Sequence, residues 1–259
     1  MVHVKNIMEY NYNAVIIMIK DSLLFWYPKI KDLPIPQPKT EIIMLTKNEL
    51  KILYSESISK EIVDKVKSAC NKMCYPCFLR TDLASAKHSW KHSCFIESSK
   101  DLPEHILNVV SFNLCAGAIG LDFKALVVRE FIPMDTRFTA FHGDMPVNPE
   151  RRYFIKDGKV LCHHSYWIED AIDEVAQIKP PSVSNWKEVL KEINTETKEE
   201  IALLTNYAEM VAKNFEGYWS IDFCKAKDGR WILIDMATGE KSWHPECNFK
   251  KEVDKNGFD

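Results

Sequence analysis

The feature that most constrains the fold is a pair of apolar runs, between residues 218 and 236, joined by Asp228-Gly229. An Asp-Gly pair between alternating apolar residues predicts an antiparallel β-hairpin, because the turn needs positive φ angles that glycine adopts without strain. A second Asp-Gly pair, at 157–158, predicts another hairpin. Antiparallel hairpins in the second half of a chain that also contains helices indicate an α+β fold rather than a doubly wound parallel sheet.

A two-residue turn at Asp228-Gly229 predicts the register of the later hairpin, with Asp222 opposite Asp235. Opposed like charges on a largely buried ribbon repel each other and lose hydration, unless they share a proton or hold a divalent cation. Two carboxylates that leave positions for phosphate oxygens are a usual way of holding Mg²⁺. Asp222 and Asp235 are therefore predicted metal ligands. The alternatives are that one Asp meets an Arg or that the register slips. The same register puts four apolar residues on the aspartate face: Cys224, Ala226, Trp231 and Leu233.

Caps and apolar periodicity predict the other elements. Ser59 begins a helix that ends before Pro76, residues 101–116 form a helix opened by a capping box, and Thr197 begins a long helix that Gly217 ends. Strands are predicted at 13–19, 41–45, 77–80, 125–132 and 137–141, the last two as neighbours, with loops at 20–38 and 81–92.

Composition excludes several classes of protein. Only 8 of 259 residues are glycine, and none of them form a G-x-G-x-x-G or a P-loop motif. The formal charge of −3 gives no strong nucleic-acid signature. The most apolar stretch, residues 14–27, is interrupted by charges and is too short to cross a membrane, and a secretory signal is not expected. The eight cysteines lie mostly in apolar runs, as expected of reduced thiols in a cytoplasmic protein.

Three cysteines, Cys70, Cys74 and Cys77, look like part of a zinc site, but no second knuckle accompanies them, so zinc is not expected there. His163 and His164 point to opposite faces of a predicted strand and cannot chelate together. Most aromatic residues belong to the predicted core. Trp90 and Trp243, in polar loops, are the candidates for lining a substrate cleft.

Four strings in order resemble the ATP-grasp superfamily: 78–90, with FLRTD and SAKHSW; 127–133, VVREFIP; 135–141, DTRFTAF; and 220–235, with SIDF and LID. They are most similar to a compact phage and microbial clade that contacts phosphates with Arg and Lys, related distantly to a eukaryotic cell-division-cycle protein that helps to assemble an initiation factor. The resemblance covers residues 34–241. It implies two α+β subdomains with antiparallel sheets that clasp ATP, divided as 49–128 and 129–259, after a short N-terminal α/β segment at 1–48.

The resemblance assigns phosphate contacts to Arg80, at a strand end, and to Lys87, in the following loop. Without it, both would be read as solvated charges. A planar guanidinium and a mobile ammonium complement each other around phosphate oxygens. Arg137 matches the basic residue that lies over the transferred phosphate, so Arg137 and Lys87 are the implied catalytic residues. Their work would be positioning and electrostatic stabilisation of the transition state.

The resemblance also places the adenine edge against the backbone of Glu130, Phe131 and Ile132. Residues 130–132 would form the hinge between the subdomains, although from sequence alone they are equally well a plain strand end. Asp135 is the implied ribose partner. ATP and Mg²⁺ are the implied cofactors, with the metal at Asp222 and Asp235.

One position departs from the family pattern, because Ala237 stands where an Asn normally completes the second metal motif. Either a second metal ion is missing or weakly held, or Thr238 or Glu240 compensates. The resemblance implies a ligase that joins a carboxylate to an amine or similar nucleophile through an acylphosphate. The acceptor would be a small molecule, a peptide or a protein. The alternative, which Ala237 favours slightly, is a non-catalytic ATP-binding assembly or chaperone module that acts on a protein partner.

Overall fold

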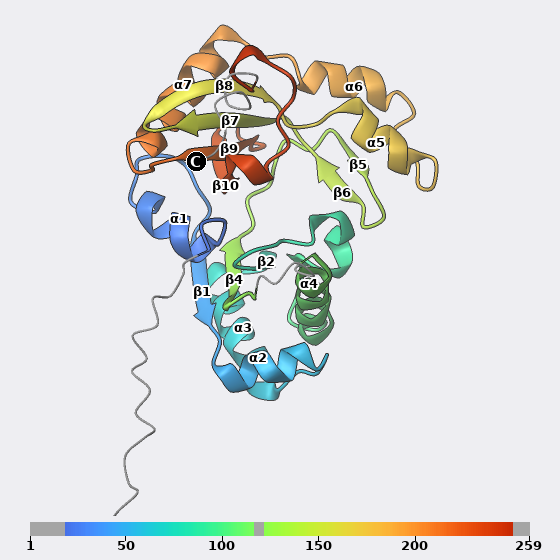
Figure 1. Cartoon of the computed structure of the whole chain (residues 1–259). Coiled ribbons are helices and arrows are strands. Elements are labelled where there is room, and N and C mark those ends of the chain that lie inside the picture. Colours follow the sequence, from blue (N-terminus) through green and yellow to red (C-terminus); the bar gives the residue numbers. More distant parts are fainter. Residues whose placement is uncertain (1–18, 117–121, 251–259) are drawn as a thin grey trace, which may run out of the picture.

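The computed structural model describes residues 19–116 and 122–250, and it folds into two lobes, each built on a four-stranded antiparallel sheet (Figure 1). The expected α+β class is confirmed. The strand predicted at 13–19 lies outside the described residues, apart from Ile19, which is not in a strand.

The first lobe contains the sheet β1-β4-β2-β3, with helices packed against it. Its helices begin at side-chain caps: Ser59 Oγ accepts from the backbone N–H of Ile62, and Thr46 forms a capping box with Glu49 that the sequence analysis missed. The elements are β1 (Thr40–Met44), α2 (Lys47–Tyr54), α3 (Lys60–Met73), β2 (Cys77–Thr81), β3 (Phe95–Ile96), α4 (Leu102–Ala116) and β4 (Ala125–Glu130).

The second lobe contains the sheet β10-β9-β7-β8. Helices α7 (Lys198–Ala212) and α1 (Leu23–Ile30) pack on one face of it, around Trp26 and Trp219. The opposite face carries the polar residues of the site described below. Its strands are β7 (Glu150–Lys156), β8 (Lys159–Ser165), β9 (Tyr218–Lys225) and β10 (Trp231–Thr238).

A smaller unit lies beside the second sheet. Residues 137–141, predicted as a neighbour of β4, instead supply β5 (Phe138–Ala140), which pairs with β6 (Met145–Val147) in a separate ribbon. The prediction was wrong because β5 has a nearer partner in the sequence. Only the four residues 141–144 separate it from β6, whereas seven residues separate it from β4. Helices α5 (Glu169–Ala176) and α6 (Trp186–Ile193) cover this ribbon. The connections also contain two short 3₁₀ helices, η1 (Lys87–His92) and η2 (Gly239–Lys241).

The register of β9 and β10 confirms Asp222 opposite Asp235, by a different route from the predicted one. Ala226 and Arg230 are hydrogen-bonded across the turn, so the loop has three residues and ends on Gly229 at φ +88°. This shifts the pairing near the turn by one residue, and a β-bulge between Leu233 and Asp235 restores it.

The shift also corrects the predicted faces of the hairpin. Trp231 and Leu233 lie in the core with Ile221 and Phe223, not on the aspartate face. Because side chains alternate along a strand, a shift of one residue moves them to the other side of the sheet.

The described part of residues 1–48 does not form a segment of its own. β1 is an edge strand of the first sheet, whereas α1, predicted as loop, belongs to the core of the second lobe. Two adjacent residues before α1 bond to opposite lobes. Asp21 Oδ1 accepts from the backbone N–H of Thr238 at 2.7 Å, and Ser22 Oγ donates to Asp82 Oδ2 at 2.6 Å.

The other sequence expectations concern cysteines and membranes. All eight cysteines are free thiols. Cys77 Sγ lies 3.5 Å from the carbonyl oxygen of Cys70 and 3.2 Å from that of Cys74, which is exposed, so packing accounts for this group. Within residues 19–116 and 122–250, no helix combines the length and the apolar character needed to cross a membrane.

Candidate functional site

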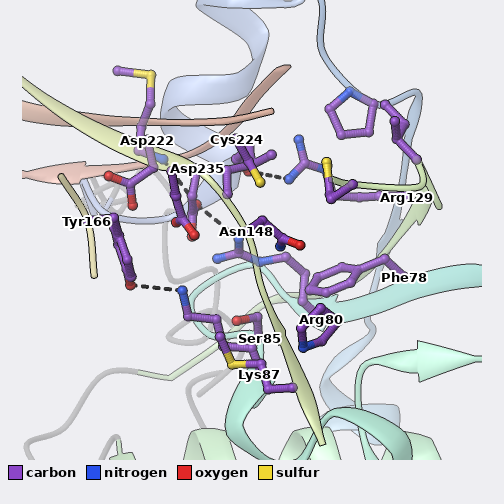
Figure 2. A pocket seen from close by; sticks show the side chains of 18 of the residues that line it. Phe78, Arg80, Ser85, Lys87, Arg129, Asn148, Tyr166, Asp222, Cys224 and Asp235 are labelled. Carbon is purple, nitrogen blue, oxygen red and sulfur yellow. Dashed lines mark hydrogen bonds and ion pairs between the residues drawn. The ribbon is translucent and has the colours of Figure 1, made fainter. Parts of the chain in front are cut away.

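The candidate site is a pocket of about 440 Å³ between the two sheets, and both lobes contribute to its walls (Figure 2). β2 and β4 supply Arg80 and Arg129 from the first lobe, and β7, β9 and β10 supply residues from the second. Trp90 and Trp243, predicted to line a cleft, both lie in its walls.

Among the cationic side chains that line the pocket, three bond to Asp222, Asp235 or Tyr166, and the sequence analysis predicted two of these three. Arg80 is 3% exposed, and its Nη1 donates to Asp235 Oδ1 at 2.9 Å. Lys87 Nζ lies 2.8 Å from the hydroxyl oxygen of Tyr166, as Figure 2 shows, and 4.3 Å from the centroid of that ring. The third cation is Arg152, which the sequence analysis did not identify.

The two opposed aspartates are each paired with an arginine. Arg152 binds Asp222 through two hydrogen bonds of 2.8 Å, from Nε to Oδ1 and from Nη2 to Oδ2, while Asp235 accepts from Arg80. One of the alternatives left open by the sequence, that an Asp meets an Arg, therefore holds for both residues. The arginines compensate the carboxylate repulsion expected from the register.

A third carboxylate, Glu150, is buried beside this cluster and was also missed by the sequence analysis. The pKa of Glu150 is raised to about 7, chiefly by burial; the charge of Lys87 opposes this rise and that of Asp222 adds to it. Burial lowers the pKa of Lys87, but Tyr166 and Glu150 raise it by more, so the ammonium stays protonated.

Three polar atoms of pocket residues are buried and have no hydrogen-bond partner among the described residues: Arg129 Nη2, Asn148 Oδ1 and Glu150 Oε1. A buried polar atom left without a partner costs roughly 1–3 kcal/mol. A polar ligand in this pocket would supply partners for these three atoms.

The residues at this end also fit a divalent cation. Asp222, Asp235 and Glu150 offer hard carboxylate oxygens, and Glu150 has one oxygen without a partner among the residues that the structure describes. Mg²⁺ is commonly held by one or two carboxylates together with phosphate oxygens of a substrate. Neither residue named as a substitute for the missing Asn is placed for this role. Thr238 Oγ1 donates to Asp21, and Glu240 is exposed and outside the pocket wall.

The other end of the pocket is apolar and aromatic. Phe78, Trp90 and Phe131 line it, and Phe95 packs behind them, with its ring centroid 5.0 Å from that of Phe131. The predicted hinge residues 130–132 all belong to the pocket wall, at the point where β4 leaves the first lobe. A flat heterocycle would find aromatic contacts and main-chain groups here.

Two of the predicted site residues are not brought to the pocket. The Arg137 guanidinium is directed to Glu192, with 2.7 Å between Nη2 and Oε1, and Arg137 is not part of the pocket wall. Asp135 is also outside it; its backbone N–H donates to the carbonyl oxygen of Lys225 beside the β9–β10 turn. Arg137 and Asp135 lie outside the pocket wall because residues 137–141 contribute a strand to the β5–β6 ribbon and do not continue the sheet of β4.

We therefore expect Arg137→Ala to bind its ligands with unchanged affinity. The side chain makes one exposed ion pair, of the kind that contributes about 0–1 kcal/mol to stability. Calorimetric titration with ATP and Mg²⁺, alongside single-turnover measurement of ADP formation, checks this. A fall of about 100-fold in turnover at unchanged affinity would return Arg137 to the transition-state role that the resemblance implied.

Comparison with known proteins agrees with this architecture. A family model for the ATP-grasp domain, the one described as family 3 of the R-2-K clade, matches residues 62–255. Among curated protein sequences, no relative matches the chain.

Solved structures are similar to this chain, and the two with TM-scores above 0.5 share its fold. C-terminally truncated Cdc123 from Schizosaccharomyces pombe is 16% identical, with a TM-score of 0.55 over 84% of this chain and 83% of that chain. A second structure of Cdc123 from Schizosaccharomyces pombe has the same identity and a TM-score of 0.54, over 85% and 83% of the two chains. Carboxyaminoimidazole ribonucleotide synthase from Aspergillus clavatus, complexed with ATP, has 10% identity and a TM-score of 0.48, over 84% of this chain and 44% of that one. With the family model matching most of its length, the chain belongs to the ATP-grasp superfamily, in family 3 of the R-2-K clade.

Proposed function

We propose that the chain binds ATP with Mg²⁺ in the pocket between its lobes. The observation that carries this is the division of one pocket into an aromatic end and an end with three cations, three carboxylates and buried polar atoms without partners among the described residues. In this proposal the adenine lies against residues 130–132 and Phe78. The phosphates extend toward Arg80, Lys87 and Arg152.

Asp222 and Asp235 would hold the Mg²⁺, with Glu150 as a third oxygen donor where the family pattern has an Asn and this chain has Ala237. The metal would neutralise phosphate charge and orient the γ-phosphate. The arginines now bound to Asp222 and Asp235 would be drawn partly to the phosphates, because a guanidinium can contact both anions at once.

The activity we propose is that of a carboxylate–amine ligase. A carboxylate oxygen of the substrate attacks the γ-phosphorus of ATP, the bond to the β,γ-bridging oxygen breaks, and ADP leaves. An amine then attacks the carbonyl carbon of the acylphosphate, loses a proton and displaces inorganic phosphate. Lys87 and Arg152 would stabilise the charge on the transferring phosphoryl group, which is the main work of a protein in such reactions.

The free thiols suit a cytoplasmic location.

A second candidate is a non-catalytic ATP-binding module that uses the nucleotide to order a surface for a protein partner. Ala237 favours it, because the methyl group in the pocket wall supplies no metal ligand. The two candidates differ in turnover. ADP release from ATP and Mg²⁺, with and without mixtures of carboxylic acids and amines, distinguishes them, since only the ligase responds to the acceptors.

Binding itself predicts a large thermal shift. At about 100 times its dissociation constant, ATP–Mg²⁺ should add ~2.7 kcal/mol to the free energy of unfolding. For a chain of this size that corresponds to about 5–10 °C in Tm. ATP without added Mg²⁺ should give a much smaller shift, because the phosphates and carboxylates then lack the shared ion. No shift with saturating ATP–Mg²⁺ would contradict the proposed function in both forms.

A further inference from the structure

A second group of metal-ligating side chains lies on the second lobe, outside the pocket wall. Cys162 and His164 lie two residues apart on one face of β8, and His244 and Cys247 come from the segment after η2. One potential ligand atom from each residue lies within 4.8 Å of all the others. We propose that these four residues form a structural zinc site.

The distances match the geometry that zinc imposes. With Zn–S of about 2.3 Å and Zn–N of about 2.0–2.1 Å, a tetrahedral site places two sulfurs about 3.8 Å apart and a sulfur and a nitrogen about 3.5 Å apart. Here the two Sγ atoms are 3.9 Å apart, and His244 Nε2 lies 3.2 Å from Cys162 Sγ and 3.3 Å from Cys247 Sγ. An S–S bond is about 2.05 Å, so the two cysteines are not a disulfide.

The surroundings orient the ligands as they do in zinc sites. His244 is buried, its Nδ1 lies 2.6 Å from the hydroxyl oxygen of Tyr218, and its ring stacks on Phe154 at 3.8 Å. A hydrogen bond at one ring nitrogen fixes a ligating histidine with its other nitrogen facing the metal. His164 Nε2 is buried and has no hydrogen-bond partner within the part of the chain that the structure describes. That nitrogen is therefore available to a metal.

The number and type of ligands favour zinc over the hard cation of the nucleotide pocket. Two thiolates and two imidazoles give a closed, four-coordinate, tetrahedral donor set, which leaves no position for a substrate. Soft sulfur ligands are unsuited to Mg²⁺, which prefers oxygen. The site is consequently structural, and it requires neither ATP nor turnover.

Its position shows what the zinc would stabilise. The segment 241–247 leaves β10 at one edge of the sheet and reaches β8 at the other, crossing the face that carries Tyr218 and Phe154 (Figure 1). Lys241, Ser242 and Trp243 of this segment line the nucleotide pocket. The backbone oxygen of Trp243 also accepts from Arg152 Nη1 at 3.3 Å. A zinc ion would fix this segment against the sheet and keep one pocket wall in place.

The test is metal analysis of the purified chain in reducing buffer without chelator, after incubation with Zn²⁺ and gel filtration. We expect about one zinc per chain. Cys162→Ser and Cys247→Ser should each reduce this content to less than about a tenth, because the fourth ligand and its charge are lost. Cys115→Ser, at an exposed thiol on α4, is the matched control and should keep its zinc.

A measurement on the unmodified chain covers the case in which these variants do not fold. Co²⁺ in place of zinc should give the intense visible absorption of a tetrahedral site with thiolate charge-transfer bands, and stoichiometric Zn²⁺ should abolish them. Zinc removal should lower Tm whether or not ATP is present, whereas failure of ATP binding would leave the zinc content unchanged. A wild-type chain that holds no zinc after incubation, or zinc content equal in Cys247→Ser and Cys115→Ser, would overturn the proposal.

Discussion

The Asp222→Asn variant is expected to lose about 3 kcal/mol in its free energy of unfolding, because it leaves the guanidinium of Arg152 without its charged partner. The pair is bidentate, and the two side chains are only 10% and 14% exposed, so water cannot replace the lost carboxylate. The expectation from two opposed aspartates alone is the reverse, a gain in stability once the repulsion is removed. Denaturant unfolding of the wild type and the variant, without nucleotide, decides the sign.

Two controls isolate the ion pair. Asp235→Asn removes a carboxylate that is 37% exposed from beside Arg80, which is 4% exposed; because water reaches this position, we expect a smaller loss of stability than in Asp222→Asn. Arg152→Gln combined with Asp222→Asn should be more stable than the sum of the two single changes predicts, since the double variant leaves no unpaired charge. Higher stability in Asp222→Asn than in the wild type would show that repulsion outweighs the Arg152 pair.

The Lys87→Met variant is expected to bind ATP–Mg²⁺ about 10- to 150-fold more weakly. A hydrogen bond to a charged group contributes roughly 1.5–3 kcal/mol, and the variant loses the contact of this ammonium with the phosphates while those proposed for Arg80 and Arg152 remain. Methionine keeps an unbranched side chain as far as Cε but loses the hydrogen bond and the cation–π contact that the ammonium makes with Tyr166. Isothermal titration calorimetry gives the affinities.

Lys91→Met is the matched control for this change. Lys91 belongs to the same 3₁₀ helix, but its ammonium pairs with Asp144 on the surface and is not part of the pocket wall. The Lys91→Met variant should bind ATP–Mg²⁺ with the affinity of the wild type. If both variants bind equally well, Lys87 is not a phosphate contact, and the polar end of the pocket serves another ligand.

The sequence predicted the hairpins and the aspartate pairing, but not how the pairing arises. Turn chemistry showed that Gly229 takes a positive φ, which is compatible with two- and three-residue loops alike. The bulge after Leu233 is a consequence of sheet packing and has no local signature in this sequence. The three-residue turn and the bulge shift the register in opposite directions. Asp222 therefore stays opposite Asp235, while Trp231 and Leu233, which lie between the two features, are on the other face of the sheet.

Two missed helices did carry local signals. Ser22 caps α1, and Thr46 with Glu49 forms the capping box of α2. α1 was missed because residues 20–38 were predicted as one loop that ends in a proline-rich segment, whereas tertiary packing of Trp26 into the second lobe stabilises the helix.

Arg152 and Glu150 could not be identified from the sequence, because their role depends on β7 lying beside β9. The order of strands in the sheet places β7 next to β9, and in this pairing Arg152 lies directly opposite Asp222. The group of Cys162, His164, His244 and Cys247 could not be identified from the sequence either, because it also depends on which segments lie side by side in the fold. The conclusion that His163 and His164 face opposite ways agrees with their contacts, since His163 stacks on Tyr153 and His164 lies near His244. What the sequence could not supply was the second pair of ligands, some 80 residues away.

The two adjacent residues before α1 connect the two lobes at one point. Asp21 is bonded to β10, and Ser22 to the buried Asp82, which also accepts from the backbone of Lys124 and Ala125 in the first lobe. A motion that keeps these bonds cannot translate one sheet away from the other. It must rotate the lobes about residues 21 and 22, so displacement increases with distance from this pivot. A spin-label pair that spans the lobes far from the pivot would therefore report the largest change in separation when nucleotide binds, and a pair beside Ser22 the smallest.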